Sequence, residues 1–108
     1  MTKLVFAKVL FEATHNWENC DIEEVAYLKH EHRHIFHIKA YVEVDHDDRD
    51  IEFIVLKHKI ENYLATFYPE NKLGGTSCEM LATELIEAFS LSKCIVSEDG
   101  ENGVEITP

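Results

Sequence analysis

The sequence lacks any long apolar run. No stretch of its 108 residues approaches the roughly 20 consecutive apolar residues that a membrane-spanning helix needs. The first residues, Met1 to Lys8, also lack the unbroken apolar segment of a signal peptide. We therefore expect a cytoplasmic protein with no membrane partner.

Cysteine is scarce, and its spacing carries no pairing motif. Cys20, Cys78 and Cys94 are an odd set without a C-x-x-C pair. Neither a disulfide framework nor a zinc ribbon is indicated. Reduced thiols agree with the expected cytoplasmic location.

Positive charge is also scarce, because 10 Lys and Arg stand against 21 Asp and Glu, for a formal net charge of -11. A phosphate-binding surface needs clustered Lys and Arg, so nucleic acid and anionic membranes are not expected as partners. Most of the acidic side chains are expected to form a solvated surface. With 45% hydrophobic residues, the chain can build one small core, and we expect residues 1–108 to form a single domain.

Histidine, by contrast, is concentrated. Four of the seven histidines fall within residues 30–37, at the start of an alternating apolar stretch. Side chains two residues apart in a strand share a face, so His32 and His34 would lie side by side. A first alternating stretch at residues 4–13 would carry His15 on its own apolar face if the strand stays regular. Zinc binds neutral imidazole nitrogens, so the pattern indicates a metal site. Taken alone, His15 would more often be a packed structural histidine.

Two neighbouring histidines fit this pattern less well. His37 has the opposite strand parity to His34 and is left out of the site. His30 shares the parity of His32 but lies further into the preceding loop, so it stays a spare ligand candidate.

The remaining periodicity predicts an α+β domain. Strands are expected at residues 4–13, 35–44, 93–98 and from 104, amphipathic helices at residues 53–68 and from 76, and a loop at residues 69–75. The order β-β-α-α-β-β implies a four-stranded antiparallel sheet with both helices on one face. Its open edges would be covered by assembly into a larger β-barrel.

The second helix carries two local expectations. Thr76 is expected to cap it, with Glu79 reaching back in a capping box. Cys78 falls in the first turn, where the helix dipole would lower the pKa of its thiol, but we expect a structural role for it.

Five segments carry a family resemblance. They are FEATH at residues 11–15, HRHIF at 32–36, IEFIVLK at 51–57, SCEMLA at 77–82 and VSED at 96–99. They are similar to F-x-A-x-H, H-G-H-x-Y/F, hydrophobic-D-F-x-x-L-K, T-x-E-x-L-A and V-x-E-T. Because the five segments follow one another in the order of these motifs, the chain resembles the 6-pyruvoyl-tetrahydropterin synthase / 6-carboxy-tetrahydropterin synthase family over nearly its whole length.

The resemblance implies a tunnelling-fold subunit in a homo-oligomer, a trimer or a hexamer of two trimers, that closes a β-barrel. The implied zinc ligands are His15, His32 and His34. The fourth coordination position of the zinc would be open to water or substrate. Glu98 would match the family's pterin-anchoring glutamate, since a carboxylate accepts two N–H bonds from an aminopyrimidine edge. The motif matches add Ser77 and Glu79 to the implied substrate-binding residues.

The chain departs from the family at the residues of proton transfer. The family's cysteine, four residues before H-G-H, is replaced by Leu28, and no Asp-His pair follows the first helix. Cys20 and Glu31 lie in the same connection and are the candidate catalytic residues, with Glu23 and Glu24 as further carboxylates there. The chain would be a divergent member that lacks the usual catalytic Cys and Asp-His pair.

Three functions follow. The first is a zinc-dependent carbon-oxygen lyase that acts on dihydroneopterin triphosphate or a related dihydropterin, with a general base that takes a proton. The alternative is a non-catalytic relative that binds zinc and a pterin or purine. In the third, the histidines only pack or titrate near pH 6.5, as in a pH switch.

Overall fold

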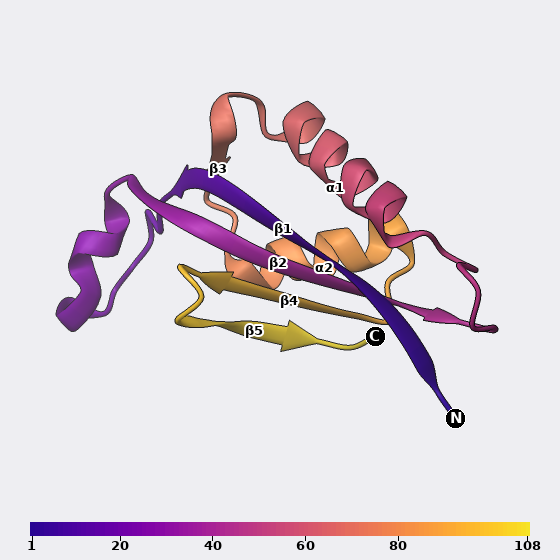
Figure 1. Ribbon diagram of the computed structural model, residues 1–108. Helices are drawn as coiled ribbons and strands as arrows, with labels where there is room; N and C mark the ends of the chain where they lie inside the picture. Colours follow the sequence, from indigo (N-terminus) through magenta and orange to yellow (C-terminus); the bar gives the residue numbers. More distant parts are fainter.

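In the computed structural model, which describes residues 1–108, an α+β fold is built on one sheet (Figure 1). The elements are β1 (Lys3–His15), η1 (Glu23–Lys29), β2 (His32–Val44), α1 (Phe53–Phe67), η2 (Pro69–Asn71), β3 (Lys72–Gly74), α2 (Cys78–Phe89), β4 (Lys93–Glu98) and β5 (Asn102–Ile106), where η marks a 3-10 helix. The predicted α+β class is confirmed, as are the two α-helices between two strand pairs.

The long hairpin of β1 and β2 forms the centre of the sheet. Its strands pair antiparallel, from Lys3 opposite Val44 to His15 opposite His32. Alternation buries Val9 of β1, and the matching alternation of β2 buries its own inner residues against the helices. Both strands continue further toward the histidine end than predicted. The alternation therefore stays regular as far as His15.

The sheet has five strands and is mixed, with the order β3-β1-β2-β4-β5, so the predicted four-stranded antiparallel sheet is wrong in these two respects. The additional strand β3 lies within residues 69–75, which were predicted to form a loop, and runs parallel to β1. Asn16 N–H donates to the Gly74 carbonyl at 2.9 Å, and the Asn71 side chain donates to the Glu12 carbonyl at 2.9 Å. A strand of three residues is too short to leave an alternation in the sequence.

Both α-helices cover the same face of the sheet, as predicted (Figure 1). Helix α1 buries Leu56, Ile60 and Leu64, and α2 buries Leu81 and Leu85 among its inner residues. These side chains join the inner residues of the strands in one apolar cluster. No helix is both long and apolar enough to cross a membrane.

The N-cap of helix α2 lies one residue later than predicted. This N-cap is Ser77, whose hydroxyl accepts an N–H of the first turn at 3.1 Å, so the predicted capping box of Thr76 and Glu79 is wrong. The Thr76 N–H donates to the Leu73 carbonyl at 3.1 Å in the turn before the helix. The Thr76 carbonyl is thereby available to His15.

The other face of the sheet leaves apolar side chains exposed. Phe6 and Leu10 of β1 and Ile35 of β2 expose 48%, 60% and 39% of their surface. Neither α-helix lies over this face (Figure 1). Exposed apolar side chains gathered on one face are typical of an interaction surface.

Candidate metal centre

Strand register brings three histidines to one end of the hairpin. His15, the last residue of β1, lies directly opposite His32, the first residue of β2. His34 is two residues further along and pairs with Ala13, so its side chain lies on the same face. The alternation that the sequence predicts thus places all three imidazoles together.

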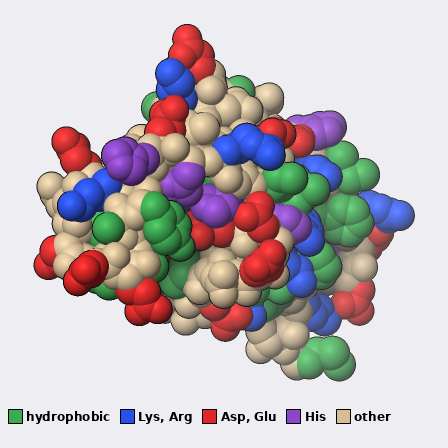
Figure 2. Space-filling view, turned by 90° about the vertical axis from the view of Figure 1, so that its left-hand side faces the viewer, with side chains coloured by type: hydrophobic (Ala, Val, Ile, Leu, Met, Phe, Trp, Pro, Cys, Tyr) green, Lys and Arg blue, Asp and Glu red, His purple; other side chains and the backbone are tan.

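The three rings form a close group. Ring centroids lie 4.5 Å apart for His15 and His32, 5.0 Å for His32 and His34, and 5.4 Å for His15 and His34. One nitrogen from each ring lies within 4.8 Å of those of the other two. Figure 2 views the molecule from the end where β1 ends and β2 begins, and shows histidine side chains side by side with carboxylates next to them. Three close histidines of this kind can hold a metal ion.

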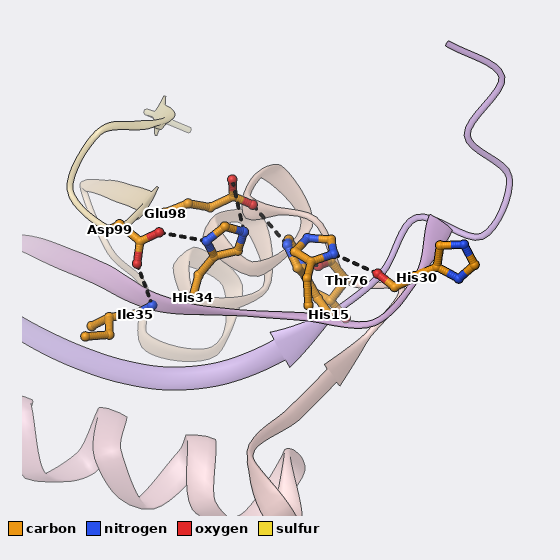
Figure 3. A network of polar contacts seen from close by, with 8 residues as sticks. His15, His30, His34, Ile35, Thr76, Glu98 and Asp99 are labelled. Atoms are coloured by element: carbon orange, nitrogen blue, oxygen red, sulfur yellow. Dashed lines mark hydrogen bonds and ion pairs between the residues drawn. The ribbon is translucent and has the colours of Figure 1, made fainter. Parts of the chain in front are cut away.

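The Nδ1 atom of each ring has a hydrogen-bond acceptor. The contacts are His15 to the Thr76 carbonyl (3.3 Å), His32 to the His30 carbonyl (2.8 Å) and His34 to the Asp99 carboxylate (2.7 Å) (Figure 3). Carbonyl and carboxylate oxygens only accept hydrogen bonds, so we assign the proton of each neutral ring to Nδ1. The Nε2 atoms then carry lone pairs, which is the form in which imidazole ligates a metal.

All three Nε2 atoms are buried and have no hydrogen-bond partner. Buried polar atoms nearly always have a partner, and leaving one unpaired costs about 1–3 kcal/mol. A cation ligated by His15, His32 and His34 would account for all three atoms at once. Imidazole ligands suit zinc, copper, iron and nickel.

Glu98, the last residue of β4, faces the same group. It pairs with Phe36 of β2, which puts its side chain on the histidine face of the sheet. Glu98 Oε2 lies 3.0 Å from His15 Nε2, and Glu98 Oε1 lies 3.8 Å from His34 Nε2. The shorter contact is within ion-pair distance, but its atoms are not aligned as a hydrogen bond. A carboxylate therefore stands beside the two Nε2 lone pairs.

Burial keeps His15 neutral. It lowers the pKa of His15 below the usual 6.5, against the opposing effects of the Thr76 hydrogen bond and the charge of Glu98. The neighbouring His32 and His34 act in the same direction as burial. At neutral pH the ring is thus already in the form that a metal requires.

Asp99 is a residue of the centre that sequence reasoning missed. Its carboxylate accepts from His34 Nδ1 at 2.7 Å and from the Ile35 N–H at 2.9 Å, and its own N–H donates to the Ile35 carbonyl at 2.8 Å. The hydrogen bond from Ile35, followed by that from His34, lowers the pKa of Asp99, which keeps its carboxylate ionised. A carboxylate on the far nitrogen of a metal-ligating histidine fixes the ring and raises its basicity.

We expect Asp99→Asn to lower metal affinity about 10- to 100-fold, the usual effect of losing an outer-shell partner. The amide keeps the size of the side chain but not its charge, so the His34 ring loses orientation and basicity. Competition with a chromophoric chelator measures the dissociation constant. Asp47→Asn is the matched control, because Asp47 is an exposed carboxylate paired with Lys3 at the other end of the hairpin. Equal affinity in the two variants would contradict the role of Asp99.

A cavity of about 570 Å³ opens beside the histidines. Its wall includes His15 and His32 together with the three residues predicted to bind substrate, Ser77, Glu79 and Glu98. Pockets for small molecules typically measure about 300–1,000 Å³. The cavity is therefore of the right size for a small ligand next to the three histidines.

The two predicted catalytic candidates lie away from this wall. Cys20 is buried, and its thiol contacts the carbonyls of Ile22 and Val25 at 3.7 and 3.6 Å. Glu31 is exposed in the connection before β2. Neither side chain lines the cavity, and a catalytic role for either stays a prediction.

Cys78 does line the cavity, but its thiol is not activated. Burial, with smaller effects from the charges of Glu98 and Glu79, raises the pKa of Cys78 to about 12. Desolvation disfavours the thiolate, so the position of Cys78 in the first turn of α2 does not yield the lowered pKa of a reactive thiol.

The two other histidines of the segment lie outside the centre. His30 supplies its carbonyl to His32, while its ring points away from the other rings (Figure 3). His37 lies beside Gly100, where a Cβ would stand 3.4 Å from the His37 ring. The structure thus leaves both rings out of the group of three.

Comparison with known proteins finds no protein-family model that matches the chain and no match among curated proteins.

Proposed function

We propose that the protein is a zinc-dependent lyase of the 6-pyruvoyl-tetrahydropterin synthase type, acting on dihydroneopterin triphosphate or a related dihydropterin. One observation carries the proposal: His15, His32 and His34 each bring a ring nitrogen within 4.8 Å of those of the other two, and their buried Nε2 atoms lack hydrogen-bond partners beside a cavity of small-molecule size. The resemblance of the five sequence segments supplies the substrate class.

In this proposal the three histidines hold zinc, which supplies a Lewis acid that polarises a side-chain oxygen of the substrate. Glu98 anchors the pterin by accepting two N–H bonds from its aminopyrimidine edge. Ser77 and Glu79, at the start of α2, form the neighbouring wall. Burial of the substrate in the cavity positions its side chain over the histidines.

Removal of a substrate proton requires a base on the cavity wall. With the histidines engaged as ligands and Glu98 as the anchor, two ionisable groups of the wall remain, Cys78 and Glu79. The pKa of about 12 leaves Cys78 protonated at neutral pH. Glu79 is therefore the base that we propose.

A non-catalytic protein that binds zinc and a pterin or purine is the second candidate. It is favoured by the placement of Cys20 and Glu31, since neither side chain lines the cavity. This protein would keep the metal centre and the Glu98 anchor and form no product.

We also propose assembly into a homo-oligomer, a trimer or a hexamer, through the sheet. The support is the exposed apolar face that carries Phe6, Leu10 and Ile35. Pairing between the open sheet edges of several copies would close the β-barrel that the resemblance implies, and the exposed apolar face would lie inside it.

Metal content and turnover, measured on the same untagged preparation, test the proposal. We expect elemental mass spectrometry to find about one zinc per chain, as for a three-histidine centre. Zinc-loaded protein should convert dihydroneopterin triphosphate, and metal-stripped protein should not. Binding without product would support the second candidate, and no zinc even after its addition would contradict both.

A further inference from the structure

We infer that Glu98 is a fourth metal ligand that leaves the metal when substrate binds. The inference rests on the proposed function, since it concerns the same three-histidine centre. It adds a second position for the Glu98 carboxylate, directed at the metal when the cavity holds no substrate.

The distances fit a shared ion. Two ligand atoms bound tetrahedrally to one zinc, each at about 2.0–2.2 Å, lie about 3.4 Å apart. The two contacts of the Glu98 carboxylate, 3.0 Å to His15 Nε2 and 3.8 Å to His34 Nε2, bracket this separation. A carboxylate oxygen is also an ordinary zinc ligand beside histidines.

The hydrogen-bond pattern argues against a simple contact between Glu98 and His15. The proton of His15 is assigned to Nδ1, where the Thr76 carbonyl accepts it, so Nε2 presents a lone pair. Glu98 Oε2, only 3.0 Å away, also presents lone pairs, and the two atoms are not aligned as donor and acceptor. Two acceptors held this close to one another are stabilised by a cation between them.

The backbone at this point is fixed while the side chain can move. Asp99 is tied to Ile35 by hydrogen bonds in both directions, which holds the end of β4 against β2. The Glu98 side chain is 31% exposed and lines the cavity, so it can turn toward a ligand there. To accept two N–H bonds from a pterin, the Glu98 carboxylate must turn both oxygens toward the aminopyrimidine edge, which directs them away from the metal. Substrate binding would therefore draw Glu98 off and open the fourth position only when substrate is present.

Cobalt(II) alone provides the probe, since its visible absorption reports the ligands and no turnover is needed. We expect Glu98→Gln to lower Co(II) affinity at least about 10-fold, no less than the loss of an outer-shell partner. Its absorption spectrum should also change, and azide should bind more tightly to the variant because water then holds the fourth position. Glu101→Gln is the matched control, since it removes the same charge from the exposed turn between β4 and β5.

The outcomes separate the inference from the proposed function. A changed spectrum and tighter azide binding in Glu98→Gln, with Glu101→Gln like the wild type, support the fourth ligand. Bound Co(II) with the same spectrum and affinity in Glu98→Gln overturns the inference and leaves the three-histidine centre intact. A wild type that binds no Co(II) overturns both. Glu98→Asp, which shortens the side chain but keeps the charge, gives a second variant if the amide is poorly folded, and it should show the same spectral change.

Discussion

His32→Ala should lower zinc affinity by at least about 100-fold, beyond the 10- to 100-fold range expected for an outer-shell partner. His32 faces His15 directly across the hairpin and supplies one of three ring nitrogens that lie within 4.8 Å of one another. Its loss leaves two histidines, too few for the three protein ligands of a catalytic zinc centre. In the wild type, zinc that binds only the folded state should add about 2.7 kcal/mol of stability at 100 times its dissociation constant. In His32→Ala, this stabilisation should be lost.

Isothermal titration with zinc and urea unfolding with and without zinc measure the two effects. His30→Ala is the matched control, since it removes a neighbouring imidazole but keeps the backbone carbonyl that orients His32. The control should bind zinc like the wild type. Zinc affinity that is equal in His32→Ala and the wild type would show that these rings only pack against one another.

The part of the centre that comes from strand alternation could be predicted from the sequence. Alternation has a period of two residues, so the parity of His32 and His34 follows once the strand is recognised. The predicted place of His15 required only that the first strand stay regular, and the structure extends it to that residue. The partnership of the two strands then follows from hairpin pairing.

Other parts of the centre depend on tertiary contacts that leave no local pattern. Asp99 adjoins a glycine between two predicted strands, which signals a turn, but nothing in the sequence says that its carboxylate reaches His34. Strand β3 exists because the chain returning from α1 passes the free edge of β1. The choice of Ser77 over Thr76 as the cap depends on the turn before α2, since both residue types cap helices well.

Phe36→Ala is expected to lower the free energy of unfolding by about 3–5 kcal/mol, the usual cost of truncating a buried phenylalanine. Phe36 is fully buried in β2, next to two of the three clustered histidines. Its ring centroid lies 5.0 Å from that of His15 and 5.8 Å from that of His34, so the same ring supports core and ligands. The expected loss is a large share of the total stability of a small domain, which is about 5–15 kcal/mol.

Urea unfolding of metal-free protein measures the loss, and Phe53→Ala is the matched control, because Phe53 exposes 52% of its surface at the start of α1. Phe53→Ala should lower the free energy of unfolding by well under half as much as Phe36→Ala, since folding buries less apolar surface at position 53. Saturating zinc should restore part of the stability of Phe36→Ala, because the ligand nitrogens remain while the support beneath them is lost. Equal losses in the two variants would mean that Phe36 is not part of the packed core under the histidines. The folded Phe36→Ala variant could bind zinc and yet gain no stability from it. That result would mean that the metal also binds the unfolded chain.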